Sequence, residues 1–163
     1  MKTVKITICS IIVLFLTNCA TKSKGKIAAN ITYEIECMGV ELDGSQTLKS
    51  WGTGRNYSDA CEQAKKNAVR DVLFVGIKKG RDECNAIPIL IDLQAKFRNE
   101  DYFNKFFADG GEYAQYVNTK DERILDKVER DKMKNDESRT HGVVVRVLRS
   151  ELKNKMIKDG IIK

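Results

Sequence analysis

The order of apolar and polar residues along the chain predicts a strand hairpin at the start of its globular part. In the first segment every second residue is apolar, which is the period of a strand buried on one face. These apolar residues are Ile31, Tyr33, Ile35 and Cys37. The alternation slips at Met38-Gly39, which predicts a bulge, and Asp43-Gly44 predicts a tight turn. Residues 46–53 then return as the second strand.

A long helix is predicted next, because small and apolar residues recur every three or four positions from Tyr57 to Val72. The small residues of this stripe are Ala60, Ala64 and Ala68. Asn56 or Ser58 can cap the first turn. Alanine side chains let a helix lie close to a sheet, and Gly52 and Gly54 are expected to permit the turn and that close approach.

A second, shorter helix is predicted over Asn99–Asp109, and Gly110-Gly111 ends it. Its aromatic residues are Tyr102, Phe103, Phe106 and Phe107. Residues four apart share one helix face, so these residues form two pairs on adjacent faces. A surface helix normally buries one stripe, so one pair is expected in the core and the other partly exposed. The exposed pair would form a partner surface or a ligand pocket.

Two later segments are less clear in their pattern. Tyr113–Val117 fits a strand. Residues 119–135 fit a helix with a capping box formed by Thr119 and Glu122, yet a strand is an open alternative.

The end of the chain completes the predicted fold. Val143–Val147 reads as a buried strand, and Ser150 is expected to cap a final helix that ends at Gly160. Together these elements predict an α+β fold, in which the long alanine-lined helix and shorter helices pack on an antiparallel sheet.

The N-terminal segment has the form of a secretion signal. Lys2 and Lys5 precede an apolar run of eleven residues, Ile6–Leu16. A membrane-spanning helix needs about 20 apolar residues, so this run fits a signal peptide better than a membrane anchor. The sequence therefore predicts a signal peptide over residues 1–18.

The run ends in Leu16-Thr17-Asn18-Cys19, which resembles the lipobox of bacterial lipoproteins. That resemblance implies that Cys19 receives a diacylglycerol, that the chain is cut just before it, and that the new amino group is acylated. Each buried methylene contributes about 0.8 kcal/mol, so two or three acyl chains anchor a protein stably. Residues 19–30 then form the lipidated end and a flexible tether, and residues 31–163 a single domain. Because Asp does not follow Cys19, we expect the outer membrane, facing the periplasm.

Three cysteines remain in the domain: Cys37, Cys61 and Cys84. In an oxidising compartment they permit one disulfide and one unpaired thiol, and the sequence leaves the pairing open. Their spacing does not match a metal site, and we predict neither metal nor cofactor.

Charge and motifs argue against nucleic-acid binding and catalysis. Removal of residues 1–18 takes Lys2 and Lys5 from the 29 basic residues and none of the 23 acidic ones, which leaves a net charge of +4. Both signs are interspersed, as on an ordinary solvated surface. His141 is the one histidine, and the sequence contains no motif that would pair it with a nucleophile.

The domain resembles the amino-terminal domain of flagellar assembly protein T and related small outer-membrane lipoproteins. The resemblance lies in the following features in their order along the chain: the strand hairpin, Trp51-Gly52-x-Gly54, the Ala60/Ala64/Ala68 helix ending in Val69-x-x-Val72-Leu73, and the Val143–Val147 strand before a Leu148/Leu152 helix ending in Gly160-Ile161. It implies an α+β fold, a role in envelope structure or assembly, and no catalysis. It also favours a strand within residues 119–135.

The sequence thus favours a lipid-anchored, non-enzymatic envelope protein that acts as a structural or assembly module at the outer membrane. Its expected partners are the membrane, through Cys19, and a protein or a second copy of the chain. The alternative is a periplasmic binding protein that holds a small apolar ligand or a glycan through the aromatic segment.

Overall fold

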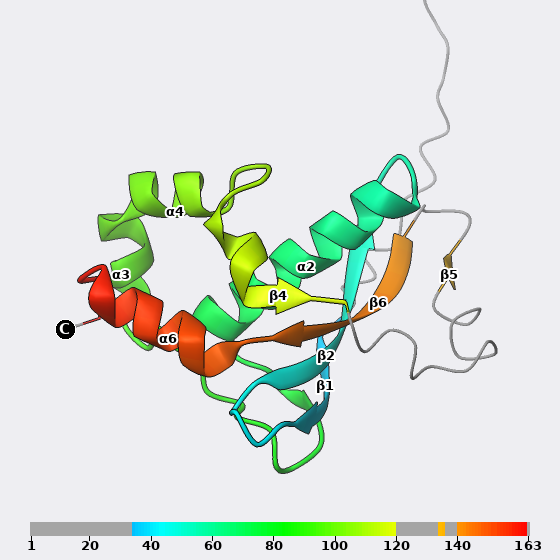
Figure 1. Cartoon of the computed structure of the whole chain (residues 1–163), viewed down its shortest axis with the longest axis horizontal. Helices are drawn as coiled ribbons and strands as arrows, with labels where there is room; N and C mark the ends of the chain where they lie inside the picture. The colour runs from blue at the N-terminus through cyan, green and yellow to red at the C-terminus, as the bar shows by residue number, and fades with distance from the viewer. Residues whose placement is uncertain (1–33, 120–133, 136–139, 163) are drawn as a thin grey trace, which may run out of the picture. The chain divides into compact units, whose positions relative to one another are not determined.

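The computed structural model describes residues 34–119, 134–135 and 140–162 (Figure 1). These residues all belong to one compact unit, Tyr33–Lys163. The predicted signal peptide, Cys19, the tether and the first residues of the predicted first strand lie outside the described residues. In the part that is described, none of the helices is both long and apolar enough to cross a bilayer.

A mixed sheet forms the centre of the fold, with strand order β3-β1-β2-β6-β4 and β5 also paired to β6. The strands are β1 (Glu36–Val40), β2 (Gln46–Thr53), β3 (Lys79–Gly80), β4 (Val117–Asn118), β5 (Lys134–Asn135) and β6 (Thr140–Val147). The pairs of β2 with β1 and β6, and of β6 with β4 and β5, are antiparallel. The short pair of β1 with β3 is parallel. The α+β class is confirmed, while the sheet is not purely antiparallel as predicted.

The predicted hairpin is confirmed, although β1 begins at Glu36 and continues past the predicted bulge to Val40. β2 spans the residues expected of it, and the register of β1 against β2 shifts between Cys37 and Gly39, where the alternation slips. Gly44 has a φ of 77°, a left-handed conformation that glycine adopts without a steric penalty. The turn closes because the Gly44 N–H donates to the Glu41 carbonyl at 2.9 Å.

Helix α2 (Tyr57–Phe74) crosses one face of the sheet and contacts β2 and β6 (Figure 1). Asn56 caps it by accepting the Asp59 N–H at 2.9 Å. The alanine stripe of the sequence is fully buried against the sheet. A Cβ atom on Gly52 would lie 2.0 Å from the Ala60 carbonyl oxygen, so only glycine permits this close approach.

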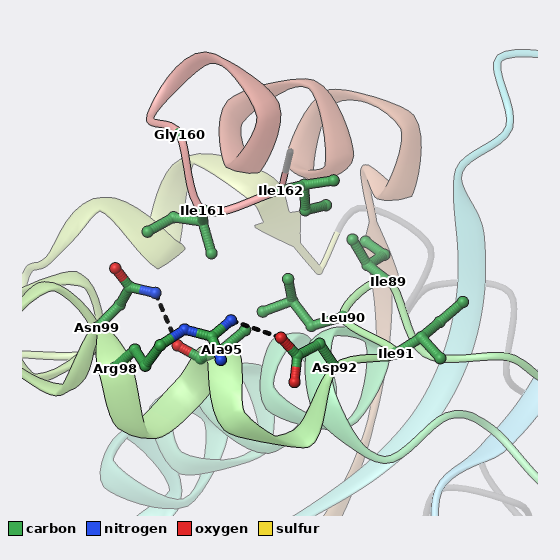
Figure 2. Close-up of a pocket in the computed structure, with 10 residues that line it drawn as sticks. All are labelled: Ile89, Leu90, Ile91, Asp92, Ala95, Arg98, Asn99, Gly160, Ile161 and Ile162. Carbon is green, nitrogen blue, oxygen red and sulfur yellow. Dashed lines mark hydrogen bonds and ion pairs between the residues drawn. The ribbon is translucent and has the colours of Figure 1, made fainter.

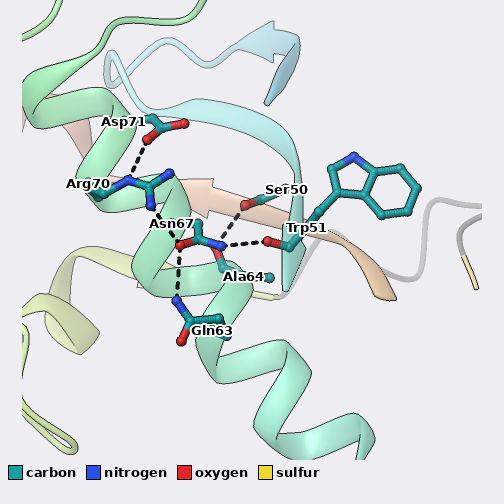
Figure 3. Close-up of polar contacts among 7 residues, drawn as sticks. All are labelled: Ser50, Trp51, Gln63, Ala64, Asn67, Arg70 and Asp71. Atoms are coloured by element: carbon teal, nitrogen blue, oxygen red, sulfur yellow. Dashed lines mark hydrogen bonds and ion pairs between the residues drawn. The ribbon is translucent and has the colours of Figure 1, made fainter. Parts of the chain in front are cut away.

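Polar side chains fasten α2 to β2 (Figure 3). The Ser50 hydroxyl donates to the Ala64 carbonyl at 2.8 Å, inside the helix–sheet contact. The Asn67 amide donates to the Trp51 carbonyl at 2.8 Å, and its oxygen accepts a hydrogen bond from Gln63 at 3.0 Å. These bonds fix the position of the helix along the strand, which apolar packing alone would leave less specific.

The segment between β3 and β4 differs from the prediction. The helix predicted over Asn99–Asp109 is present as α4 (Glu100–Phe106), which ends three residues earlier than predicted, and a further helix that was not predicted, α3 (Leu93–Arg98), precedes it with a break at Asn99. The predicted strand Tyr113–Val117 is wrong, because Glu112–Tyr116 form the 3-10 helix η1. Tyr116 stacks on Phe106 and Tyr113 stacks on Phe107, and these ring contacts hold the segment as a 3-10 turn.

The final helix α6 spans Arg149–Lys158. Its N-cap is Leu148, so the predicted cap at Ser150 is wrong: Ser150 already lies inside the first turn. The predicted end at Gly160 is confirmed. Gly160 has a φ of 72° and donates to the Ile157 carbonyl, while Ile161 donates to the Met156 carbonyl, the two bonds of a Schellman motif. Of the ambiguous residues 119–135, most lie outside the described part, and Lys134–Asn135 form β5.

A disulfide joins Cys37 on β1 to Cys84, 47 residues along the chain. Cys61, on α2, does not take part in this bridge and is half-buried. The structure thus selects one of the pairings that the sequence left open. The bridge ties the segment after β3 to the sheet.

Candidate functional site

The aromatic residues predicted as a partner or ligand surface are part of a larger aromatic cluster. Its rings belong to Phe74, Tyr102, Phe103, Phe106, Phe107, Tyr113 and Tyr116. Phe74 of α2 meets Phe103 of α4 edge to face, with ring centroids 4.9 Å apart. Phe107 stacks on Tyr113 of η1 with centroids 6.0 Å apart. The cluster therefore joins α2, α4 and η1. Three of its seven rings, those of Phe103, Phe106 and Tyr113, are buried in the core, and the other four are half-buried.

The expectation that one pair of residues four apart would be buried is wrong. The buried residues are Phe103 and Phe106, three apart, with 4% and 2% of their surface exposed, and Tyr102 and Phe107 are half-buried. The reason is that α4 packs against two neighbours at once. Phe103 faces Phe74 on α2, while Phe106 stacks with Tyr116 on η1 at 6.1 Å. Each predicted pair therefore contributes one core residue and one residue at the surface.

The hydroxyl groups of two tyrosines are tied to carboxylates. Tyr102 donates to Asp159 at 2.6 Å, and Tyr113 donates to Glu62 at 3.1 Å. Burial raises the pKa of Tyr113 to about 12, with the Glu62 carboxylate acting in the same direction. Burial and the bond to Asp159 raise the pKa of Tyr102 further. Both hydroxyls are therefore neutral donors that connect segments of the fold.

A lysine completes this network at the end of α6. Lys155 Nζ lies 2.6 Å from a Glu112 carboxylate oxygen and 3.1 Å from Asp159 Oδ2. Both acids raise the pKa of Lys155, and the bond from Tyr102 and then Lys155 lower that of Asp159. The network binds α6 to η1 and α4.

A cleft of about 560 Å³ lies beside the aromatic cluster, between α3 and the C-terminal end of α6 (Figure 2). Three segments line it: residues 89–92 before α3, the α3 side bearing Ala95, Arg98 and Asn99, and the tail 160–162. In Figure 2 the side chains of Ile161, Leu90 and Ile89 follow one another across the cleft beneath the ribbon of α6.

Backbone hydrogen bonds place the floor of the cleft. Ile89 and Leu90 donate to the carbonyls of Val72 and Leu73 at 3.0 and 2.8 Å, so this segment lies against the C-terminal end of α2. The left-handed turn at Gly160 then carries Ile161 back onto the domain. The floor is thus rigidly attached to the core.

The lining combines aliphatic side chains with polar groups, among them one neutralised ion pair. The Arg98 guanidinium donates to the Asp92 carboxylate, which lowers the pKa of Asp92, and Asp92 also caps α3 by accepting the Gln94 N–H. Asn99 donates its side-chain amide to the Ala95 carbonyl at 2.7 Å. The cleft therefore offers an apolar ligand a surface of isoleucine and leucine and little net charge.

A second hollow, of about 600 Å³, lies between α2 and Gly110 and is polar. Its charged side chains are paired: Arg55 with Asp59 at 3.0 Å, and Lys66 with Asp109 at 2.6 Å. Exposed pairs of this kind are ordinary surface features, and they leave little unsatisfied charge for a ligand.

The other candidate chemical groups lie apart from the cleft lining. His141, on β6, packs edge to face on Tyr57 with ring centroids 5.4 Å apart. Within the described ranges, His, Cys, Asp and Glu form no group of three that could hold a metal ion. Sequence reasoning missed the cleft. Comparison of the chain with protein-family models, with curated proteins and with solved structures finds no match.

Proposed function

We propose that this chain is an exported, lipid-anchored protein of the cell envelope, attached to the outer membrane through Cys19 and facing the periplasm. In this proposal it works without catalysis, as a structural or assembly module. The observation that carries the proposal is the N-terminal segment: an eleven-residue apolar run after two lysines, ending in Leu16-Thr17-Asn18-Cys19.

The disulfide supports export. Disulfides persist in oxidising compartments and are rare in the reducing cytosol. Cys37 is fully buried and bridges to Cys84, so the pair belongs to the fold of the domain. A protein that needs this bridge for its fold is best suited to the periplasm.

Exposed apolar side chains support an interaction role. Ile87, Ile91 and Phe97 are 61%, 75% and 69% exposed, and all three lie within eleven residues of chain. Tyr102 and Phe107 add half-buried rings shortly after them. Exposed apolar side chains close together in a soluble domain are typical of protein contact surfaces. We infer that this part of the domain contacts a protein partner or a second copy of the chain.

A second candidate function is ligand binding. The aliphatic cleft beside α3 favours it, because its volume of about 560 Å³ lies within the usual range for small-molecule sites. Its aliphatic lining favours an apolar ligand over a glycan, whose rings normally stack on aromatic side chains. The ligand would then lie beside the aromatic segment and not among its rings.

Lipid labelling tests the anchor. Cells that express the wild-type chain or Cys19→Ser are grown with radiolabelled palmitate and then fractionated. We expect label on the wild-type protein in the membrane fraction, and an unlabelled Cys19→Ser protein that a high-salt wash releases. Cys61→Ser is the matched control, because it removes a half-buried thiol far along the sequence from the lipobox and should remain labelled. A labelled Cys19→Ser protein would refute the lipobox assignment.

A further inference from the structure

Arg149 differs from the other arginines in the described part of the chain, because no carboxylate there pairs with it. Each of the others forms an ion pair with an acid: Arg55, Arg70, Arg81, Arg98 and Arg146. The Arg149 guanidinium donates instead to two neutral oxygens, the Ile87 carbonyl at 2.6 Å and the Gln46 side chain at 3.5 Å.

The position of Arg149 is unfavourable for an unpaired cation. The residue is half-buried, and burial lowers the pKa of its guanidinium. It is also the first residue of α6, where the helix dipole disfavours positive charge. A guanidinium has five N–H donors in a planar fork that fits a carboxylate, and two are engaged here. An anion at this point would relieve the cost of burial and use the remaining donors.

The unpaired cation lies close to the apolar cleft. Arg149 donates to the carbonyl of Ile87, and Ile89, two residues further along the chain, lines the cleft. Two residues of chain span at most about 7 Å. Figure 2 shows Ile89 beneath α6, with Leu90 and Ile161 continuing across the cleft from there. The positive group and the apolar surface are therefore within reach of one small molecule.

We propose that this domain binds a single-chain amphiphilic carboxylate, a molecule of the fatty-acid class, with its apolar chain in the cleft and its carboxylate on Arg149. The charge complementarity selects this occupant. The charged groups among the described lining residues, Asp92 and Arg98, pair with each other, so a ligand carboxylate would turn to the unpaired Arg149 beyond the Ile89 end. This inference rests on the ligand-binding candidate function and is independent of the anchor at Cys19.

Calorimetric titration with three probes tests the proposal. The full chain is synthesised in a lipid-free, oxidising cell-free system, so that no attached lipid competes. Dodecanoate carries both the chain and the charge, dodecanol the chain alone, and acetate the charge alone. We expect dodecanoate to bind about tenfold more tightly than dodecanol, as a charge-assisted hydrogen-bond pair would provide, and acetate to give no measurable binding.

Variants assign each part of the ligand. Arg149→Met should bring dodecanoate binding down to that of dodecanol, while Arg149→Lys, which retains the charge without the fork, should keep part of the preference. Ile162→Asp should weaken both probes by introducing a carboxylate at the cleft. Arg55→Met is the matched control and should change neither affinity. Arg55 is exposed and paired with Asp59 at the N-terminal end of α2, whereas the cleft segment lies against the C-terminal end of that helix. Thermal melting of each variant verifies that it is folded.

The possible results distinguish the role of Arg149 from the binding of a ligand in the cleft. Equal binding of dodecanoate and dodecanol by the wild-type chain would overturn the role of Arg149 and leave the cleft as an apolar site. Absence of binding by either probe would overturn both the inference and the ligand-binding candidate. An unchanged preference in a folded Arg149→Met protein would also overturn the inference, because the carboxylate would then be bound elsewhere.

Discussion

Tyr102 and Asp159 are 57 residues apart in sequence, and the Tyr102 hydroxyl donates a hydrogen bond to Asp159 Oδ2 at 2.6 Å. Tyr102 lies on α4, and Asp159 is the C-cap of α6. The bond therefore joins the aromatic cluster to the helix that covers the cleft. Since the Tyr102 ring also stacks on Phe106, this one side chain connects the core to the C-terminal end of α6.

This bond should make stability depend on pH in acid. Its formation lowers the pKa of Asp159 below the ordinary value of 3.8. Its contribution is therefore fully present above about pH 4, and it is lost as pH falls through the lower pKa of the folded state. Tyr102→Phe should lower the free energy of unfolding by about 1–2 kcal/mol at neutral pH. The difference from wild type should shrink as pH falls below 4, as measured by urea unfolding.

Tyr116→Phe is the matched control for this measurement. The Tyr116 hydroxyl makes no hydrogen bond to the residues that the structure describes, so its loss should cost little at any pH. A pH-independent difference between Tyr102→Phe and wild type would show that the Asp159 bond does not carry the effect.

The face of α2 that contacts the sheet should tolerate substitution least. Ala64 is fully buried, and its carbonyl accepts the Ser50 hydroxyl. Ala64→Arg should lower the free energy of unfolding by several kcal/mol, because a long cation would replace a methyl group in a dry contact. Gln63→Arg introduces the same side chain one position away on the exposed face, where its guanidinium can replace the Gln63 amide as donor to Asn67, and it should change stability by about 0.5 kcal/mol or less. Equal shifts in melting temperature would contradict the assigned face.

Lys66→Ala would be a poor control for this measurement. The periodicity places Lys66 on the polar side of α2, yet its ammonium lies 2.6 Å from Asp109 and 5.4 Å from the Tyr113 ring centroid. Both partners come from a segment that the local pattern of the helix cannot reveal. A side chain's exposed position on its own helix does not exclude contacts with distant parts of the chain.

Local signals predicted the parts of the fold that local physics determines. The bulge after Cys37, the turn at Gly44, the Asn56 cap and the end at Gly160 each depend on neighbouring residues, and each is confirmed. The sequence also predicted the close helix–sheet contact from Gly52. In these places one residue type is needed for a backbone reason that can be read without tertiary structure.

The segments that the sequence predicted wrongly depend on tertiary contacts. Tyr113 alternates like a strand residue, but its ring stacks on Phe107 and its hydroxyl bonds to Glu62, which holds it in a 3-10 turn. The cleft was missed because it joins residues 89–92 to the tail 160–162, and neither segment has a motif of its own. Arg149 resembled any other basic residue in the sequence, since only the structure reveals which arginines have acidic partners.

Loss of the disulfide should destabilise the domain and loosen the segment before the cleft. Cys84→Ser removes a crosslink that closes a long loop, and we expect a loss of about 2–4 kcal/mol in the free energy of unfolding. Hydrogen exchange should rise most in the segment that contains Cys84 and Ile89, because the bridge to Cys37 ties it to the sheet. Cys61→Ser leaves the bridge intact and should change exchange only near α2. Unchanged exchange in the Cys84→Ser protein would show that backbone bonds alone hold this segment.

The aromatic residues of α4 should separate stability from binding. Phe103 is buried against Phe74, and Phe103→Ala should cost about 3–5 kcal/mol through lost burial and a cavity. Phe107 is half-buried beside Phe106 and Tyr113, so Phe107→Ala should cost clearly less. If the proposed partner surface includes Phe107, its loss should weaken recovery of the crosslinked partner from intact cells more than its effect on melting would explain.

Phe97→Ala tests the same surface, because Phe97 is 69% exposed and its truncation should leave the melting temperature nearly unchanged. Normal recovery of the partner by both stable variants would place the contact outside the aromatic segment, and an equal loss of stability in Phe103→Ala and Phe107→Ala would mean that α4 is entirely core.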